Sequence, residues 1–530
     1  MTTLVQSVDW LALAPPALTA LSALALLVTD LFLPEHRKGL LGWLAAGGLA
    51  LALLSLLPLL DGDRTTFCLG AGSHACSYSA DHFTLVIQLL VLGGALVTTL
   101  LSLTAVKDLA LPAGEYWFLL LASASGAALL PASRDLATLV VALEVASLPG
   151  FALVGLKHGD RRSSEAALKF FLSSVAATAV TLLGVSFVYA TTGTLHLTDL
   201  AEGLQHVDGQ FQTLARAGVA LTLVGFAFKT AAVPFHFWVP DTYVGAPLPV
   251  AAYLSVVGKA VGFTGIALIT VLGFPSYADV WGPALAVLAA LTMTAGNAAA
   301  LRQRADRLTS AVRLLAWSSV GQAGYLLVPL AAAAYTDHPE HALGSTVAYA
   351  LMYGVVNLGA FAVVAAVTRV RPASRLSDYR GLYAEHPALA LLLAFFLLCL
   401  AGLPPGLVGL FAKVTVFSAA VDAGLGWLAV LMALNVAVAL VYYLRWTAEL
   451  FRPAAASQET PAAASQATPA TGLRQAPADP TTAVPALATD SSALPVPFPL
   501  TAALALTGLL ALALSGAPQL ILRFTTTALF

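Results

Sequence analysis

The sequence predicts an all-α integral membrane protein with about 14 transmembrane helices. Of its 530 residues, 59% are hydrophobic and only 10% are charged, whereas roughly 25% of the residues of a soluble domain are charged. Apolar stretches of about 20 residues, long enough to cross about 30 Å of hydrocarbon, recur along the whole chain. Because backbone polar groups inside a bilayer need partners within their own segment, these stretches must be helices. A water-soluble globule is therefore excluded.

The expected spans are defined by their apolar runs. The first run is too long for the core of a signal peptide, and no small-residue cleavage site follows it, so we expect it to remain as the first span. The runs lie at about residues 11–33, 40–60, 83–106, 115–133, 135–156, 164–191, 214–238, 247–273, 279–301, 309–335, 343–368, 387–421, 425–451 and 497–523.

Charge and cysteine content exclude several classes of protein. The net charge of −2 excludes a basic nucleic-acid binder, so no nucleic acid is expected as a partner. The three cysteines, Cys68, Cys76 and Cys399, are fewer than the roughly four closely spaced ligands of a thiolate metal site or an iron–sulfur cluster. We therefore expect no metal site and no redox chemistry in this chain itself.

Lysine and arginine residues between the spans indicate the orientation. Only Arg64 and Arg134 fall on one side of the expected topology. The positive-inside rule places the richer side in the cytoplasm and both termini outside. The residues on the richer side are Arg37, Lys38, Lys107, Lys157, Arg161, Arg162, Arg302, Arg304, Arg307, Arg369, Arg371, Arg375, Arg380, Arg452 and Arg474.

Residues 453–495 differ in composition from the rest of the chain. They hold a near-repeat, AAASQETP and AAASQATP, within a tract rich in Ala, Pro, Ser and Thr. Because such a tract has few large apolar side chains to offset its ordering entropy, we expect a disordered cytoplasmic linker, most simply a spacer without a binding role.

The loop of residues 61–81 holds two of the three cysteines, Cys68 and Cys76. The expected topology places both on the oxidising side of the membrane. A disulfide between them is feasible there, and two free thiols are the alternative.

Charged residues inside the expected spans are the main candidates for function, because each costs about 3 kcal/mol at the bilayer centre and needs protein or water around it. Glu144 lies nine residues, or about 13 Å of helix, past Asp135 and needs a cationic partner near mid-membrane. His236 lies seven residues after Lys229, on nearly the same helix face. Four of the seven lysines also fall within spans: Lys169, Lys229, Lys259 and Lys413.

These residues also have structural interpretations. Lys169 follows Glu165 by four residues, so an i,i+4 pair or snorkelling to the cytoplasmic surface explains it without transport. His236 is either a proton relay or a hydrogen-bond partner of a carbonyl. For Glu144, Lys229 and Lys259 the alternative is a fixed salt bridge. Because hydrophobic replacement of such a bridge is often neutral or stabilising, a fixed bridge is a weak reason for a membrane protein to keep these charges.

Two spans carry residues that interrupt a helix. The seventh contains Pro234 and Pro240, and the twelfth contains the run Gly402-Leu-Pro-Pro-Gly-Leu-Val-Gly. Proline removes a backbone donor and glycine relaxes the chain, so both helices are expected to break within the membrane, with Lys229 and Lys413 beside the breaks. The spacing of five spans predicts two inverted five-helix repeats, each with a discontinuous helix at an ion path, and ordinary proline kinks are the alternative.

The chain accordingly divides into five parts. The repeats comprise spans 4–8 and spans 9–13. In order, the parts are helices 1–3 in residues 1–113, the first repeat in 114–273, the second repeat in 274–452, the linker in 453–495 and the last helix in 496–530.

Four stretches carry a resemblance to known proteins: Leu143-Glu-Val-Ala-Ser-Leu-Pro, Glu165-Ala-Ala-Leu-Lys-Phe-Phe, Phe228-Lys-Thr-Ala-Ala-Val-Pro-Phe-His-Phe-Trp-Val-Pro-Asp-Thr-Tyr-Val-Gly-Ala-Pro and Leu314-Leu-Ala-Trp-Ser-Ser-Val-Gly-Gln-Ala-Gly-Tyr. The chain resembles the antiporter-like membrane subunits of respiratory complex I, most closely those of the subunit N type of bacterial NADH:quinone oxidoreductases. The third stretch is the most specific, and the resemblance covers nearly the whole chain apart from the linker.

The resemblance implies roles for individual residues. Glu144 matches the acidic residue of the family's fifth helix, and Lys229 matches its lysine partner in the broken seventh. Lys259 matches the central lysine of the eighth helix. Lys413 matches the terminal lysine of the twelfth, where the subunit M type has an acid. Gln322 stands where related chains often have histidine, so we assign it no proton-carrying role.

The function implied by the resemblance is that of a proton-translocating subunit of complex I in a bacterial plasma membrane. NADH, FMN, iron–sulfur clusters and quinone would be bound by partner subunits, and this chain would contact other antiporter-like and small quinone-proximal membrane subunits. Lys229 would hold its proton while paired with Glu144 and then pass it by water and His236 to Lys259 and toward Lys413. Lys169 completes the set of candidate proton-translocating residues.

Two other interpretations share these features. A subunit of a multi-subunit cation/proton antiporter without redox coupling would have the same helix breaks and lysines. A non-conducting scaffold paralogue would have the same fold but would have lost proton transfer.

Overall fold

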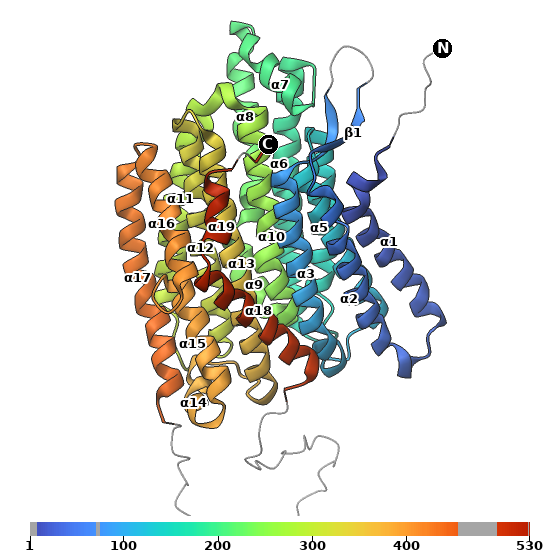
Figure 1. Cartoon of the computed structure of the whole chain (residues 1–530), viewed down its shortest axis with the longest axis vertical. Helices are drawn as coiled ribbons and strands as arrows, with labels where there is room; N and C mark the ends of the chain where they lie inside the picture. Colours follow the sequence, from blue (N-terminus) through green and yellow to red (C-terminus); the bar gives the residue numbers. More distant parts are fainter. Residues whose placement is uncertain (1–7, 70–74, 454–495, 528) are drawn as a thin grey trace, which may run out of the picture.

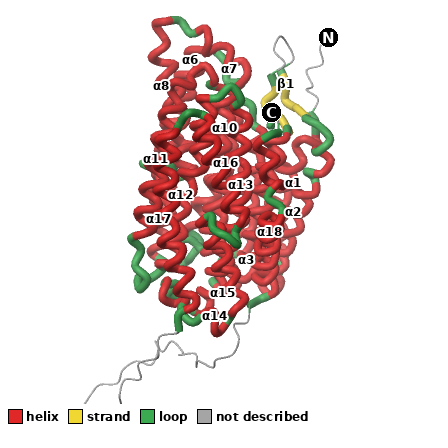
Figure 2. The backbone as a smooth tube through the Cα atoms, turned by 60° about the vertical axis from the view of Figure 1, so that its left-hand side comes forward, coloured by secondary structure: helices red, strands yellow, loops and turns green. Residues whose placement is uncertain are grey.

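The computed structural model of the chain describes residues 8–69, 75–453, 496–527 and 529–530. Long helices run side by side in one bundle (Figure 1), and loops lie mainly at its two ends (Figure 2). The helices are α1 (Trp10–Phe32), α2 (Gly39–Leu54), α3 (His82–Asp108), α4 (Ala113–Leu129), α5 (Leu136–Val154), α6 (Arg161–Thr192), α7 (Leu197–Gly203), α8 (Gln212–Thr230), α9 (Trp238–Gly245), α10 (Leu248–Leu268), α11 (Ala278–Leu301), α12 (Ser310–Ala332), α13 (Pro339–Val370), α14 (Leu382–Glu385), α15 (Pro387–Ala401), α16 (Leu407–Asp422), α17 (Gly426–Phe451), α18 (Phe498–Gly516) and α19 (Gln519–Leu522).

The helices confirm a multi-pass membrane protein. In the described part of the chain, 13 helices are long and apolar enough to cross a membrane. The segment expected as the twelfth span consists of two shorter helices, α15 and α16, separated by residues 402–406. The total of 14 spans and the inverted repeats therefore stay predictions.

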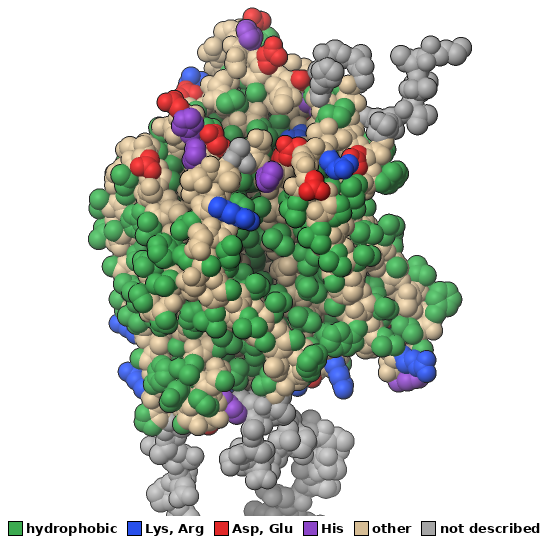
Figure 3. Space-filling model, in the orientation of Figure 1, with side chains coloured by type: hydrophobic (Ala, Val, Ile, Leu, Met, Phe, Trp, Pro, Cys, Tyr) green, Lys and Arg blue, Asp and Glu red, His purple; other side chains and the backbone are tan. Residues whose placement is uncertain are grey.

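The two ends of the bundle carry different elements (Figure 1). We call the end with β1, α7 and α19 the hairpin end, and the end with α14 the linker end, because α17 ends and α18 begins there. Both ends of the described chain lie at the hairpin end, as the expected topology requires. Acidic side chains gather at the hairpin end on the face drawn in Figure 3. The expected linker itself, apart from Pro453, lies outside the described residues.

A β-hairpin occupies the loop between α2 and α3, where the sequence analysis expected no strand. Strands β1 (Arg64–Cys68) and β2 (Cys76–Ala80) pair antiparallel, with Cys68 opposite Cys76. The two cysteines form a disulfide, so the first of the two alternatives is confirmed. Such strands are too short for a periodicity argument, which is why the sequence did not reveal them.

Asp9 joins this hairpin to the start of α1. Its carboxylate accepts hydrogen bonds from the backbone N–H groups of Ala12 and Leu11 at 3.1 and 3.0 Å and pairs with Arg64 at 3.1 Å. These interactions, above all the one with Ala12, lower the pKa of Asp9 from its usual value. An acidic N-cap of this kind satisfies free N–H groups and complements the helix dipole.

α10 is the central helix of the bundle. Every residue from Pro249 to Leu268 is buried, and the helix packs against α3, α5, α8, α12 and α13. A Cβ atom on Gly262 would lie 2.4 Å from the backbone nitrogen of Thr230. Glycine at this position therefore lets the end of α8 rest directly on α10, next to Lys259.

Candidate functional site

The seventh expected span is interrupted after Thr230. Ala231 adopts a left-handed backbone conformation with φ of 70°, and α8 ends there. A 3₁₀ turn at Phe235–Phe237 and the short helix α9 complete the segment. Pro234 explains the interruption, because it has no N–H to continue the helical hydrogen bonds.

Lys259 contacts the end of this first half-helix. Its side chain is fully buried on α10, and its Nζ donates to the carbonyl oxygen of Thr230 at 3.4 Å. The last carbonyl groups of a helix lack partners within the helix and carry partial negative charge. The interrupted α8 therefore offers the lysine a charge-complementary group within the span.

Lys413 has the same kind of contact at the second interruption. Its Nζ donates to the carbonyl oxygens of Leu400 and Ala401 at 2.8 and 2.7 Å, and it lies 5.5 Å from the centre of the Tyr325 ring. α15 ends at these carbonyl groups because Gly402 turns left-handed, with φ of 82°. Both interruptions thus present helix-end carbonyl groups to a buried lysine.

Lys229 lies in an aromatic environment. Its Nζ is 5.1 Å from the centre of the Phe170 ring and 5.6 Å from that of Phe151, distances at which a cation interacts with a ring face. Among the described residues, none accepts a hydrogen bond from this buried Nζ. Glu144 acts on it electrostatically. The fixed, contacting salt bridge considered as an alternative is not the arrangement of this structure.

Glu144 lies in the middle of α5 and is half-buried. Its Oε1 accepts a hydrogen bond from the hydroxyl of Thr178 on α6 at 2.6 Å. This hydrogen bond ties the carboxylate of α5 to α6. Thr178 could not be identified from the sequence, because nothing in the order of residues indicates which position of α6 faces Glu144.

The expected position of His236 is wrong in one respect. The seven-residue spacing places it on the face of Lys229 only if the helix continues, and α8 ends between the two residues. His236 instead lies in the 3₁₀ turn, with its ring centre 5.6 Å from that of Trp317. Its Nδ1 is buried and has no hydrogen-bond partner in the described part of the chain.

Lys169 differs from the three buried lysines. It pairs with Glu165 at 2.8 Å, as the four-residue spacing predicted, and also with Asp241 at 2.9 Å. Its side chain is 49% exposed. The structure therefore places Lys169 in a network of surface ion pairs and not among the partners of Lys259 or Lys413.

A chain of buried polar groups begins one turn from Lys259. Ser255 precedes Lys259 by four residues on α10, and its hydroxyl accepts from Asn357 Nδ2 at 2.6 Å. The hydroxyl of Tyr353 donates to the carbonyl oxygen of Ser255 at 3.1 Å and lies at hydrogen-bond distance, 3.0 Å, from the hydroxyl of Ser319. These groups link α10 to α13 and α12.

The chain continues on α12 to the second break. Ser318, adjacent to Ser319, lies 2.5 Å from the Tyr443 hydroxyl. Gln322 Nε2 donates to that hydroxyl at 3.0 Å and to the carbonyl oxygen of Leu400 at 3.4 Å. Leu400 is the carbonyl group that binds Lys413. Polar side chains therefore extend through the buried interior between the two lysines.

Most of these buried polar groups are not evident from the sequence alone. The stretch from Leu314 contains Ser318, Ser319 and Gln322, but its order of residues does not indicate which helices these side chains face. A usable signal was present on α13, where Tyr353 and Asn357 lie four residues apart and thus on one face of a strongly apolar helix. Polar groups kept on one face of a buried helix require partners there.

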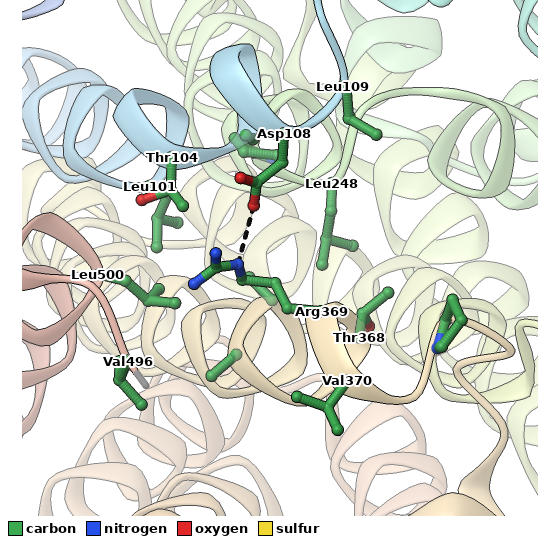
Figure 4. Close-up of a pocket in the computed structure, with 15 residues that line it drawn as sticks. Leu101, Thr104, Asp108, Leu109, Leu248, Thr368, Arg369, Val370, Val496 and Leu500 are labelled. Carbon is green, nitrogen blue, oxygen red and sulfur yellow. Dashed lines mark hydrogen bonds and ion pairs between the residues drawn. The ribbon is translucent and has the colours of Figure 1, made fainter. Parts of the chain in front are cut away.

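A cavity between four helices is separate from these lysines. It has a volume of about 690 Å³ and lies between α3, α10, α13 and α18. Figure 4 shows Asp108 and Arg369 facing each other across it, joined at 2.8 Å. Its α10 residue Pro249 precedes Lys259 by ten residues, or about 15 Å along the helix. This cavity is therefore not part of the candidate site.

Comparison with known proteins identifies the family. The family described as NADH:quinone oxidoreductase/Mrp antiporter, transmembrane, matches residues 133–439. This range includes Glu144 and the three buried lysines.

Relatives match over almost the whole chain. NADH-quinone oxidoreductase subunit N 2 from Streptomyces griseus is 70% identical over 526 residues, which are 99% of this chain and 95% of that protein. NADH-quinone oxidoreductase subunit N from Salinispora tropica is 46% identical over 85% of this chain and 87% of its own length.

Solved structures share the fold. A chain of respiratory complex I from Thermus thermophilus, with bound aureothin, is 30% identical and superposes with a TM-score of 0.73 over 96% of this chain and 98% of that chain. A chain of the Mrp complex from Dietzia is 24% identical, with a TM-score of 0.76 over 97% and 96%. This chain therefore belongs to the family of antiporter-like transmembrane subunits of NADH:quinone oxidoreductases and Mrp antiporters.

Proposed function

We propose that this chain is a proton-translocating membrane subunit, of the subunit N type, of an NADH:quinone oxidoreductase. The observation that carries the proposal is the 70% identity to a subunit N over nearly the full length of both chains. The buried lysines at the helix breaks support it, because charged groups inside a membrane protein usually mark an ion path.

The proposed mechanism moves a proton between these lysines. Lys229 keeps its proton while the charge of Glu144 acts on it and releases it when that interaction weakens. His236 and water carry the proton to Lys259. The hydroxyl groups between Lys259 and Lys413 bind the water or exchange the proton along the second half of the path, and the amide groups hold these hydroxyls by hydrogen bonds.

The energies involved are within reach of such a switch. Moving a proton against about 150–200 mV requires about 3.5–4.6 kcal/mol. A thousandfold change in the proton affinity of one group corresponds to about 4 kcal/mol. Burial together with the gain or loss of one charge partner produces changes of this size.

The partner subunits complete the enzyme in this proposal. They bind NADH, FMN, the iron–sulfur clusters and quinone, and this chain carries out no redox step. The complex lies in the bacterial plasma membrane, with the hairpin end of this chain outside and the linker end in the cytoplasm. Residues 453–495 act there as a spacer.

The test is proton pumping by the complex purified from native membranes. The co-purifying subunits are identified by mass spectrometry, and NADH-driven pumping is measured in proteoliposomes. We expect Lys259→Met and Lys413→Met to abolish most of the pumping. Lys107→Met, a lysine in the last turn of α3, is the matched control and should pump normally.

Two results would contradict the proposal. Co-purification with subunits of a cation/proton antiporter, without flavin or iron–sulfur subunits, would favour the antiporter without redox coupling. Normal pumping by both lysine variants in a fully assembled complex would favour the non-conducting scaffold.

A further inference from the structure

The hairpin end of α13 carries a group of metal-binding side chains. The helix begins at Pro339, between His338 and Glu340, and His341 follows in the first turn. One ligand atom from each of His338, Glu340 and His341 lies within 4.8 Å of the other two. None of these residues belongs to the proposed proton path.

The individual distances approach those of a metal site. His338 Nδ1 is 3.3 Å from Glu340 Oε1, and His341 Nε2 is 3.9 Å from the same oxygen. Ligand atoms on a tetrahedral Zn²⁺, each about 2.0–2.1 Å from the ion, lie about 3.3 Å apart. The separations of up to 4.8 Å among the three ligand atoms are wider than this, so binding requires the exposed side chain of His338 and the carboxylate of Glu340 to move toward His341.

A second interaction orients one of the ligands. The Nδ1 of His341 lies 2.6 Å from the carbonyl oxygen of Thr525, in the turn after α19. A carbonyl oxygen can only accept, so Nδ1 carries the proton and Nε2 presents its lone pair toward Glu340. Metal-binding histidines commonly have such a partner on the second nitrogen, which fixes the ring and raises its basicity.

The group lies at the edge of a polar cavity. A cavity of about 360 Å³ is lined by His338 and His341 and, from α16, by Thr415, Ser418 and Asp422. The carboxylate of Asp422 adds negative charge near the group. The cavity gives a hydrated ion a route to the ligands and room for the water that completes its coordination.

We propose that His338, Glu340 and His341 form a binding site for Zn²⁺ or a similar divalent transition metal. The expectation of no metal site rested on the cysteine count, which does not bear on a set of histidine and carboxylate ligands. Two imidazole nitrogens, one carboxylate oxygen and water are a ligand set that suits Zn²⁺, whereas Mg²⁺ and Ca²⁺ prefer oxygen ligands. The simpler alternative is a hydrated helix start, in which the two histidines only pair with Glu340.

Metal at this site also affects proton release, a consequence that rests on the proposed function. Thr415 follows Lys413 by two residues on α16, so the cavity borders the hairpin-end side of that lysine's helix. A bound cation there places positive charge beside the outward path and opposes the passage of protons. We therefore infer that Zn²⁺ slows pumping.

The experiment measures zinc binding to the intact purified complex. The complex is dialysed against Zn²⁺ with excess Mg²⁺, and bound zinc is counted by mass spectrometry. We expect His338→Ala, Glu340→Gln and His341→Ala each to bind one zinc fewer per complex, or to bind it at least about tenfold more weakly. His206→Ala removes an exposed histidine at the same end of the bundle and should leave the count unchanged.

The outcomes separate the site from its effect. An unchanged zinc count and affinity in all three assembled variants would overturn the site. Equal inhibition of pumping by Zn²⁺ in wild type and variants would overturn the effect on proton release. If the wild type did not pump even without added zinc, the proposed function would be contradicted. The binding measurement would still show whether the zinc site exists. If an alanine variant fails to assemble, His338→Gln and His341→Gln replace it.

Discussion

Lys413 donates from Nζ to the carbonyl oxygen of Ala401 at 2.7 Å, at the point where α15 ends. The interrupted helix thus supplies the lysine with a neutral partner in place of a carboxylate. A neutral partner binds the ammonium ion without fixing its charge as strongly as a salt bridge does, because the helix end carries only about half an elementary charge. This arrangement suits a group that must both hold and release a proton.

Adding one methyl group to α10 should disturb its close packing against the end of α8, at the first interruption. A Cβ on Gly262 would lie 2.4 Å from the backbone nitrogen of Thr230, so Gly262→Ala must push α8 away from Lys259. We expect a loss of about 1–3 kcal/mol in stability, as for other overpacked sites, and reduced pumping. Thermal unfolding of the purified complex and proteoliposome pumping measure the two effects.

Gly258 provides the matched control for this change. It lies one turn earlier on α10, and a Cβ there would contact only the side chain of Leu254, at 3.7 Å or more. Gly258→Ala should therefore leave stability and pumping near those of the wild type. If the two substitutions had equal effects, close packing of α8 against α10 would not explain the effect of Gly262→Ala.

Gln322 should be structurally important even though it carries no proton. It accepts a hydrogen bond from the Tyr349 hydroxyl and donates one to that of Tyr443. Gln322→Leu leaves the buried Tyr349 hydroxyl without its acceptor, a loss that costs about 1–3 kcal/mol, whereas the Tyr443 hydroxyl keeps its hydrogen bond with Ser318. We expect a lower thermal unfolding temperature of the complex. Gln303→Leu, which loses a hydrogen bond to the carbonyl group of Ala299 one turn earlier, should change it far less.

The spans and the helix breaks could be predicted from sequence because their causes are local. Apolar length defines a span, and Pro234 interrupts one wherever it stands. The partners of the charges could not be predicted in this way. Thr178 reaches Glu144 only when α5 and α6 pack together, and Lys413 reaches Leu400 only after the chain turns at Gly402. Such contacts depend on how helices are placed, which periodicity does not encode.

The orientation can be tested with single cysteines at the two ends of the bundle. Gln205→Cys lies just after α7 at the hairpin end, and Ala384→Cys lies in α14 at the linker end. In right-side-out vesicles, a membrane-impermeant maleimide should label the first and spare the second. Protease should likewise spare residues 453–495 in these vesicles. The reverse labelling pattern would invert the topology that the positive-inside rule predicts.

The disulfide should be present in the protein isolated from cells. Peptide mapping without reductant should recover Cys68 and Cys76 in one linked species. Closing a loop of this length stabilises the folded hairpin by about 2–3 kcal/mol through the entropy of the open chain. Cys68→Ser should therefore loosen the hairpin but leave pumping unchanged, since the candidate site lies within the spans. Alkylation of both wild-type thiols without reduction would refute the bond.

Glu144 and Lys229 should act as one unit in proton transfer. Glu144→Gln keeps the shape of the side chain and can still accept from Thr178, but it removes the charge that acts on Lys229. Lys229 should then lose its proton more readily, and the switch should lose one of its two states. Assembly should survive, because a lysine without its counter-charge can become neutral. NADH-driven pumping should fall severely in Glu144→Gln and equally in Lys229→Ala.

The double variant distinguishes a shared step from two separate ones. If the two residues serve the same step, the fold-loss of pumping in the double variant Glu144→Gln/Lys229→Ala should be much smaller than the product of the fold-losses in the two single variants. Glu202→Gln, an exposed acid on α7, is the control for loss of a carboxylate and should pump normally. Independent, multiplicative losses would indicate that Glu144 acts on some group other than Lys229. Unchanged pumping in both single variants, with the complex intact, would show that neither Glu144 nor Lys229 is needed for proton transfer. The interaction between the two residues would then have only a structural role.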